Sequence, residues 1–126
     1  MTILDDLKYS KDHEWVRMEA NVATIGITDF AQSELGDIVY IEVEAVGEIL
    51  ETGDIFGSVE AVKAVSDLFL PVSGKILEFN EAINDSPDKV NRDPYGEGWI
   101  IKVEIETKEN VSNLLSAESY KELIGA

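Results

Sequence analysis

The chain is divided into short apolar runs by turn-forming residues, and this feature limits its possible folds more than any other. Through the middle of the chain the breaks fall at Gly47, Gly53, Pro71, Gly74 and Pro87. Each run has about the length of one strand, and glycine and proline allow the chain to turn between runs. The spacing therefore predicts a mostly β fold, arranged as an antiparallel sandwich or barrel.

Composition and capping signals predict the elements of the first half. Three stretches rich in β-branched and aromatic residues are expected to form strands, at Glu14 to Met18, Val22 to Ile27 and Ile38 to Val43. Between the last two we expect a short helix. Thr28 or Asp29 can cap its N-terminus, and Gly36 stands where a left-handed residue commonly ends a helix.

The second half predicts two more strands and a final helix. PVSGKILEF is expected to turn at Ser73 and Gly74 and to continue as a strand. Trp99 to Ile105 predicts a strand, with Ile101, Val103 and Ile105 on one face and charged side chains on the other. The tail SAESYKELIGA predicts a helix, with Ser116 as its N-cap and Gly125 beyond its end.

Length and charge limit the classes of function. A chain of 126 residues suits one compact domain, and we expect residues 1–126 to form a single one. The net charge of -16 opposes binding to nucleic acid or anionic membranes, and no apolar run approaches the roughly 20 residues of a membrane span. Cysteine is absent, so redox chemistry would have to come from a cofactor.

The N-terminal residues bear on location. MTILDDLKYSKDHEW has neither the apolar core of a secretory signal nor the arginine-rich composition of a transit peptide. We therefore expect a cytoplasmic protein of bacterial type, or a mitochondrial matrix protein if the chain is a processed one. We also expect it to act as a monomer.

The side chains offer little for catalysis. The chain has one histidine and no GxSxG motif, so a Ser-His-Asp arrangement would rest entirely on His13. A structural or surface role for His13 is favoured. A metal site combining it with Asp85, Asp88 and Asp93 is conceivable, but these acids lack EF-hand spacing and are expected on a solvated loop.

The segment DPYGEGW does not predict nucleotide binding. Ile101 stands where the third glycine of GxGxxG would fall, and no basic residue follows as in a phosphate-binding loop. A tight turn is the alternative. Pro94 would fix φ there, and Gly96 and Gly98 would allow positive φ.

Lys63 lies in a stretch of small and β-branched residues, FGSVEAVKAVSDLFLPVSG. The residues in this stretch fit both helical spacing and strand alternation, so the pattern predicts neither a helix nor a strand. A hairpin tip at residues 62–64 would lack the Gly, Asn or Asp that tight turns usually need. From the residues alone, an ordinary solvated lysine is the default interpretation.

Four blocks of sequence favour a different interpretation of Lys63. SKDHEWV, GITDFAQSELGDIVYIE, GSVEAVKAVSDLFLPVSG and VNRDPYGEGW stand in the order found in glycine-cleavage H-proteins. The chain resembles that family from about Tyr9 to Ile105. The resemblance implies a single lipoyl/biotinyl-type β sandwich (a barrel-sandwich hybrid) with short helices, a C-terminal helix and a modified lysine on a hairpin. One departure, the lack of a proline near Val43 to Gly47, is expected to affect turn stiffness only.

The resemblance implies a cofactor and its attachment site. Lys63 occupies the position of the modified lysine, and Glu60 and Gly74 fall where the family's lipoylation context has them. Biotinyl domains usually flank their lysine with methionines, whereas this chain has Val62 and Ala64. The implied cofactor is therefore lipoate, bound covalently to Lys63.

The resemblance also implies a carrier and not an enzyme. Such a carrier takes the aminomethyl group of glycine from a pyridoxal-phosphate glycine decarboxylase to a tetrahydrofolate-dependent aminomethyltransferase. Dihydrolipoyl dehydrogenase then reoxidises it, and a lipoyl-attachment enzyme supplies the cofactor. The alternative is an H-like relay protein that passes lipoyl groups on during lipoate assembly, since both roles need the same modified lysine.

Overall fold

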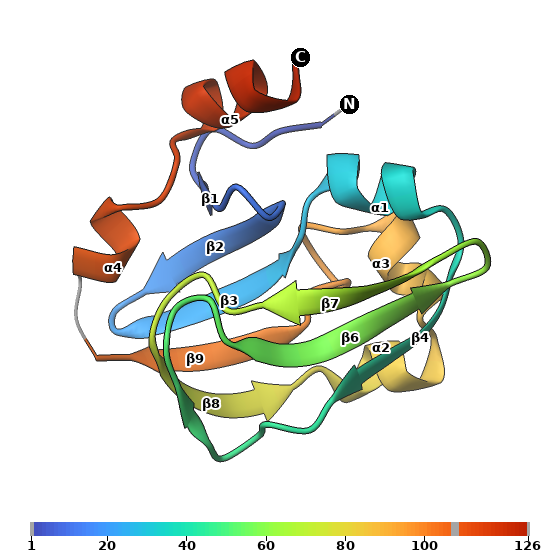
Figure 1. The fold of residues 1–126 in the computed structure, drawn as a ribbon, viewed down its shortest axis with the longest axis horizontal. Helices are drawn as coiled ribbons and strands as arrows, with labels where there is room; N and C mark the ends of the chain where they lie inside the picture. The colour runs from blue at the N-terminus through green and yellow to red at the C-terminus, as the bar shows by residue number, and fades with distance from the viewer. Residues whose placement is uncertain (1, 107–108, 126) are drawn as a thin grey trace.

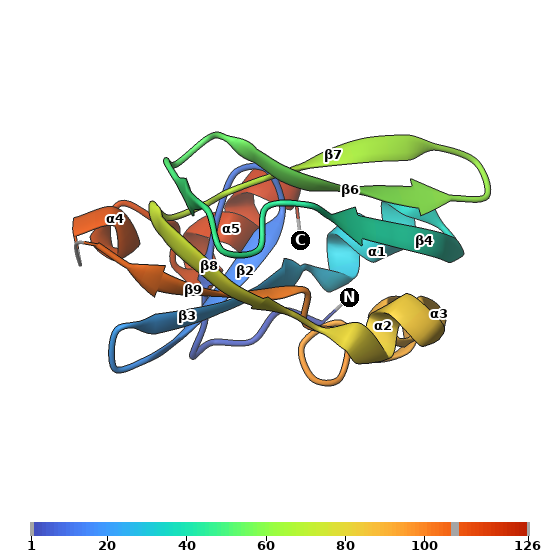
Figure 2. The ribbon, with the colours of Figure 1, turned by 90° about the horizontal axis from the view of Figure 1, so that it is seen from below.

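The strands of the computed structural model, which describes residues 2–106 and 109–125, form two antiparallel sheets. Their bounds are β1 (Lys8–Tyr9), β2 (Glu14–Glu19), β3 (Val22–Ile27), β4 (Ile38–Val43), β5 (Ile49–Leu50), β6 (Ile55–Ala61), β7 (Val65–Phe69), β8 (Gly74–Phe79) and β9 (Ile101–Ile105). One sheet has the order β1-β2-β3-β9-β8-β5, and the other has the order β4-β6-β7. The smaller sheet lies across the larger one (Figure 2), so the predicted antiparallel sandwich is confirmed.

The core fills the space between the two sheets. The larger sheet contributes Ile25 and Val103, and the smaller one contributes Phe56 and Val59, all of them buried in one cluster. Along β9 the buried positions alternate with more exposed ones, as predicted for a strand with one face on a core.

Short helices close the ends of the sandwich (Figure 1). Their bounds are α1 (Asp29–Leu35), α2 (Glu81–Asp85), α3 (Asp88–Arg92), α4 (Glu109–Ser112) and α5 (Ala117–Ile124). Helices α2 and α3 lie beside β4, and α5 packs on the N-terminal segment, where Tyr120 stacks on Tyr9 with ring centroids 4.7 Å apart.

Among the described residues, no helix has the length and apolar character to cross a membrane. The single domain of residues 1–126 stays a prediction, because its two end residues lie outside the described part.

Capping signals located two helices correctly. The Thr28 hydroxyl accepts a hydrogen bond from the Ala31 N–H at the start of α1, and Ser116 caps α5, which ends at a left-handed Gly125. Gly36 does end α1, but with φ 81 and ψ -157 and not in the left-handed helical conformation that we expected. Helices α2 and α3 were not predicted, because their five-residue lengths are too short for a clear helical period.

The prediction of positive φ at Gly96 and Gly98 is wrong, since neither glycine has it. A side chain at Gly96 would collide with the carboxylate of Asp93, and one at Gly98 would collide with the carbonyl oxygens of Asp93 and Lys89. These glycines are needed because the neighbouring chain approaches closely, and not because of unusual backbone angles.

Replacing Gly74 with alanine should destabilise the fold. Gly74 is buried in β8, and a Cβ there would collide with the Glu104 carbonyl oxygen and lie 2.8 Å from Val103 Cγ1. Because a paired strand would have to shift, we expect the free energy of unfolding to fall by about 1–3 kcal/mol. Urea denaturation measures the change. The control Lys75→Ala, at an exposed position of the same strand, should stay within about 0.5 kcal/mol of wild type. Equal stability of Gly74→Ala and wild type would contradict the packing described.

Candidate functional site

Lys63 lies at the tip of the hairpin formed by β6 and β7. The two strands stay paired up to the turn, where the Ala61 N–H donates to the Ala64 carbonyl oxygen over 2.7 Å. This leaves Val62 and Lys63 as a two-residue turn, and both are exposed. In Figure 1 the β6–β7 loop projects at the right-hand end of the molecule. The lysine is therefore accessible to other proteins.

The turn at Val62 and Lys63 is not one that its local sequence favours. The two-residue turns that match strand twist have positive φ, and neither of these residues has it. Support comes instead from the link between α1 and β4, where the Asp37 carbonyl oxygen accepts a hydrogen bond from the Val62 N–H over 3.0 Å. A contact from elsewhere in the chain thus replaces the turn residues that local rules require.

The methylene groups of Lys63 lie over Gly36. A Cβ built on Gly36 would be 3.4 Å from Lys63 Cε and 3.8 Å from Cδ. The lysine side chain therefore lies against the backbone of the α1–β4 link.

The structure separates the two residues expected to assist lipoylation. Glu60 is exposed on β6, close to the turn and paired in register with Tyr40 and Val65. Gly74 begins β8, whose start lies at the opposite end of the molecule from the β6–β7 loop (Figures 1 and 2). The structure thus brings Glu60 near Lys63 and does not bring Gly74 there.

A cavity of about 480 Å³ lies between the hairpin and α1. Apolar side chains form much of its wall, including Ile27, Phe30, Leu35 and Leu68. Acidic residues also line it, namely Asp12, Glu14, Glu34 and Asp67. Such a cavity can enclose a small apolar group that carries a positive charge.

Glu14 is the buried acid of this cavity. It is only 2% exposed, and its Oε1 accepts a hydrogen bond from the Ser10 hydroxyl over 2.5 Å. Burial raises the pKa of Glu14 to about 8, with a smaller rise from the nearby Asp12 and an opposing effect of the Ser10 hydrogen bond. The raised pKa favours the neutral, protonated form of this buried carboxyl group. It can lose this proton when a cation enters the cavity.

His13 connects three parts of the chain. Its Nδ1 lies 2.9 Å from the Tyr120 hydroxyl of α5, which in turn lies 2.7 Å from the hydroxyl of Thr28. The ring also packs on Phe30 of α1, with centroids 5.0 Å apart. Burial lowers the pKa of His13. These contacts support the structural role favoured from the sequence.

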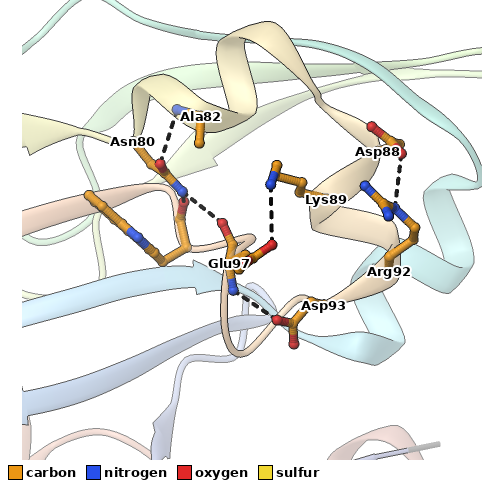
Figure 3. A network of polar contacts seen from close by, with 8 residues as sticks. Asn80, Ala82, Asp88, Lys89, Arg92, Asp93 and Glu97 are labelled. Carbon is orange, nitrogen blue, oxygen red and sulfur yellow. Dashed lines mark hydrogen bonds and ion pairs between the residues drawn. The ribbon is translucent and has the colours of Figure 1, made fainter.

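The acids considered for a metal site have other roles (Figure 3). Asp88 pairs with Arg92 across 2.9 Å, and Asp93 accepts a hydrogen bond from the Glu97 N–H over 3.0 Å. Asp85 is the last residue of α2. In the part of the chain that the structure describes, no group of three or more His, Asp or Glu side chains could hold a metal ion.

Comparison with known proteins places the chain in a family. Residues 7–126 match the family model described as glycine cleavage H-protein. The chain belongs to this family. It is 54% identical over 125 residues to the glycine cleavage system H protein of Staphylococcus haemolyticus (strain JCSC1435), with 99% of each chain covered. Its fold is similar to the crystal structure of the Mycobacterium marinum glycine cleavage system H protein (GCVH), with a TM-score of 0.90 and 38% identity. That match covers 98% of this chain and 100% of the other.

Membership of the H-protein family confirms the predicted function. The chain is a lipoyl carrier component of the glycine cleavage system and is not itself a catalyst. The alternative role in lipoate assembly is not favoured, because the matching proteins are named for glycine cleavage.

Glu14→Gln should remove one component of the pH dependence of stability. A carboxyl group that titrates near pH 4.5 when unfolded and at about 8 when folded makes the native state less stable as pH rises between those values. The difference in unfolding free energy, variant minus wild type, should therefore rise by about 1.4 kcal/mol per pH unit from pH 5 to 8 and then level off. Urea denaturation across this range measures it. A difference that does not change with pH would contradict the raised pKa.

Proposed function

We propose that Lys63 carries the lipoyl group of this H-protein through an amide bond to its side-chain nitrogen. The observation that carries the proposal is the place of Lys63, exposed at the tip of a hairpin that is anchored by a hydrogen bond from another segment. The family carries lipoate. Attachment also removes the charge of the lysine, so the modified arm can enter an apolar site without the cost of burying an ammonium group.

The residues around Lys63 fit such a group. When attached, lipoate supplies a dithiolane that accepts and releases the one-carbon amine and can be reduced and reoxidised. Side chain and lipoyl chain together span about a dozen bonds, roughly 14 Å when extended at ~1.2 Å per bond. Ser66, which lines the cavity, is three residues from Lys63, or no more than about 11 Å along the chain. The cavity is therefore within reach of the arm.

We propose that this cavity protects the loaded arm between enzymes. Ile27, Leu35 and Leu68 give the cavity an apolar lining, and Glu14 is another of its lining residues, whose carboxyl group would pair with the amine. An incoming cation would lower the pKa of Glu14 towards its ordinary value, since an opposite charge favours the ionised carboxylate. The cavity would thus hold the charged form of the carried amine. The chain itself contributes shelter and charge pairing, and bond breaking is left to the partner enzymes.

The partners proposed are those of the predicted cycle. The family implies enzymes of the glycine cleavage system. We propose that they are the pyridoxal-phosphate glycine decarboxylase, the aminomethyltransferase, dihydrolipoyl dehydrogenase and the lipoyl-attachment enzyme. We further propose that the protein works as a cytoplasmic monomer, that Glu60 contributes to recognition by the attachment enzyme, and that Gly74 contributes through the shape of the fold. The expected lack of binding to nucleic acid and membranes stays a prediction.

Lys63→Arg should leave the fold intact and abolish carrier function. An exposed turn residue makes few packing contacts, so stability should change by less than about 0.5 kcal/mol. Guanidinium is not acylated under the conditions that modify lysine, so no arm would form. The measurement is glycine-dependent bicarbonate exchange with purified decarboxylase, after treatment with lipoate and the attachment enzyme and removal of free lipoate. Lys75→Arg is the matched control and should keep full exchange. Wild-type exchange by a folded Lys63→Arg variant would refute the assignment.

A further inference from the structure

We infer that Asn91 and Gly36 are positioning residues for Lys63, which hold the hairpin tip in the orientation that the lipoyl-attachment enzyme recognises. The inference rests on the proposed attachment of lipoate to Lys63. Neither residue touches the lysine nitrogen in the structure. They act through the backbone of the α1–β4 link on which the hairpin lies.

Asn91 fixes this link from both sides. Its Nδ2 donates to the Gly36 carbonyl oxygen and to Gln32 Oε1, each over 2.9 Å, and its Oδ1 accepts from the Ile38 N–H over 2.9 Å. The bonded backbone groups belong to the residues directly before and after Asp37. Asn91 therefore determines where the Asp37 carbonyl oxygen points.

Asp37 transmits this position to the hairpin. Its carbonyl oxygen accepts the Val62 N–H, which is the support that the turn receives from the α1–β4 link. The turn itself has no positive φ, and the primed turns that best fit strand twist require it. Its orientation is therefore set by the link as well as by its own residues.

Gly36 completes the support. Its backbone angles, φ 81 and ψ -157, belong to a region that only glycine populates readily. Because Gly36 lacks a side chain, the Lys63 methylene groups can lie directly over the backbone. Any other residue would strain the link at this positive φ, and its Cβ would lie in contact with the Lys63 methylene groups.

A fixed tip lowers the cost of recognition. An enzyme that must insert one lysine into a narrow active site binds a pre-ordered hairpin with less loss of conformational entropy. Releasing the tip should therefore reduce enzymatic modification without hiding the lysine. A merely structural residue would not produce this combination.

The test compares Asn91→Asp with Asn80→Asp in the full chain. Both aspartates keep the shape of asparagine and remove two Nδ2 hydrogen bonds. Asn80 Nδ2 donates to the carbonyl oxygens of Glu97 and Trp99, each over 2.8 Å, at the start of α2 (Figure 3). Asn80 is thus a matched control away from the hairpin.

Asn91→Asp should lower kcat/KM for lipoylation by the attachment enzyme roughly tenfold, with lipoate and ATP supplied and the Lys63 fragment measured by mass. Hydrogen exchange of the Val62 amide should become faster. The rate at which acetic anhydride acetylates Lys63 should change less than twofold, because the amine stays exposed. Asn80→Asp should alter none of these readouts at temperatures where it is folded. If Asn91→Asp does not fold, Gly36→Ala takes its place with the same expected results.

Two results would overturn the inference. One is lipoylation of Asn91→Asp at the wild-type rate. The other is equal slowing in Asn80→Asp, which would show that lost stability alone is responsible. If the proposed function is wrong, a different result is expected: wild-type protein would not be lipoylated on Lys63. That result would overturn the inference as well.

Discussion

Contact between the inner faces of the two sheets is the interaction on which the carrier site depends. A hairpin such as β6–β7 is marginally stable by itself in water. Here Phe56, Val59 and Leu68 anchor its base in the shared core, and the larger sheet supplies the opposing surface. The anchored base allows the tip with Lys63 to project into solvent while keeping a fixed direction. Destabilising the sheet contact would therefore remove both the exposure and the orientation of the lysine.

A carrier needs an exposed attachment residue and a shielded site for the group that it carries. In this structure an exposed turn and a cavity lie next to each other. The lysine must be exposed to reach several enzymes, and Val62 and Val65 beside it are 75% and 69% exposed. The carried amine needs shelter, and the cavity next to the hairpin combines an apolar wall with the buried Glu14. The arm proposed on Lys63 is long enough to alternate between the two. The proposed roles of tip and cavity would explain how a carrier that is not itself a catalyst can assist a reaction sequence.

Local signals in the sequence predicted much of the fold. Strands β3 and β4 have the predicted bounds, because β-branched residues and flanking breaks define them, and Thr28 and Ser116 mark helix starts by ordinary capping. The turn at Val62 and Lys63 could not be derived locally, because its support comes from Asp37, 25 residues earlier in the chain.

Less of the site could be predicted from the sequence, for the same reason. The family resemblance, and not turn chemistry, singled out Lys63. Glu14 and Asn91 both lie within blocks that carry the resemblance, but their roles depend on the folded chain. Glu14 is buried in it, and Asn91 forms hydrogen bonds to residues more than 50 positions away. No periodicity or short motif encodes such contacts.

The most direct test of lipoate attachment at Lys63 is a fragment mass map of the protein purified from cells supplied with lipoate. We predict one lipoyl group per chain, on the fragment that contains Lys63, and none on fragments with other lysines such as Lys75 or Lys102. A lipoyl group on a different lysine would contradict it. So would unmodified protein from cells whose attachment enzyme lipoylates a known acceptor at the same time.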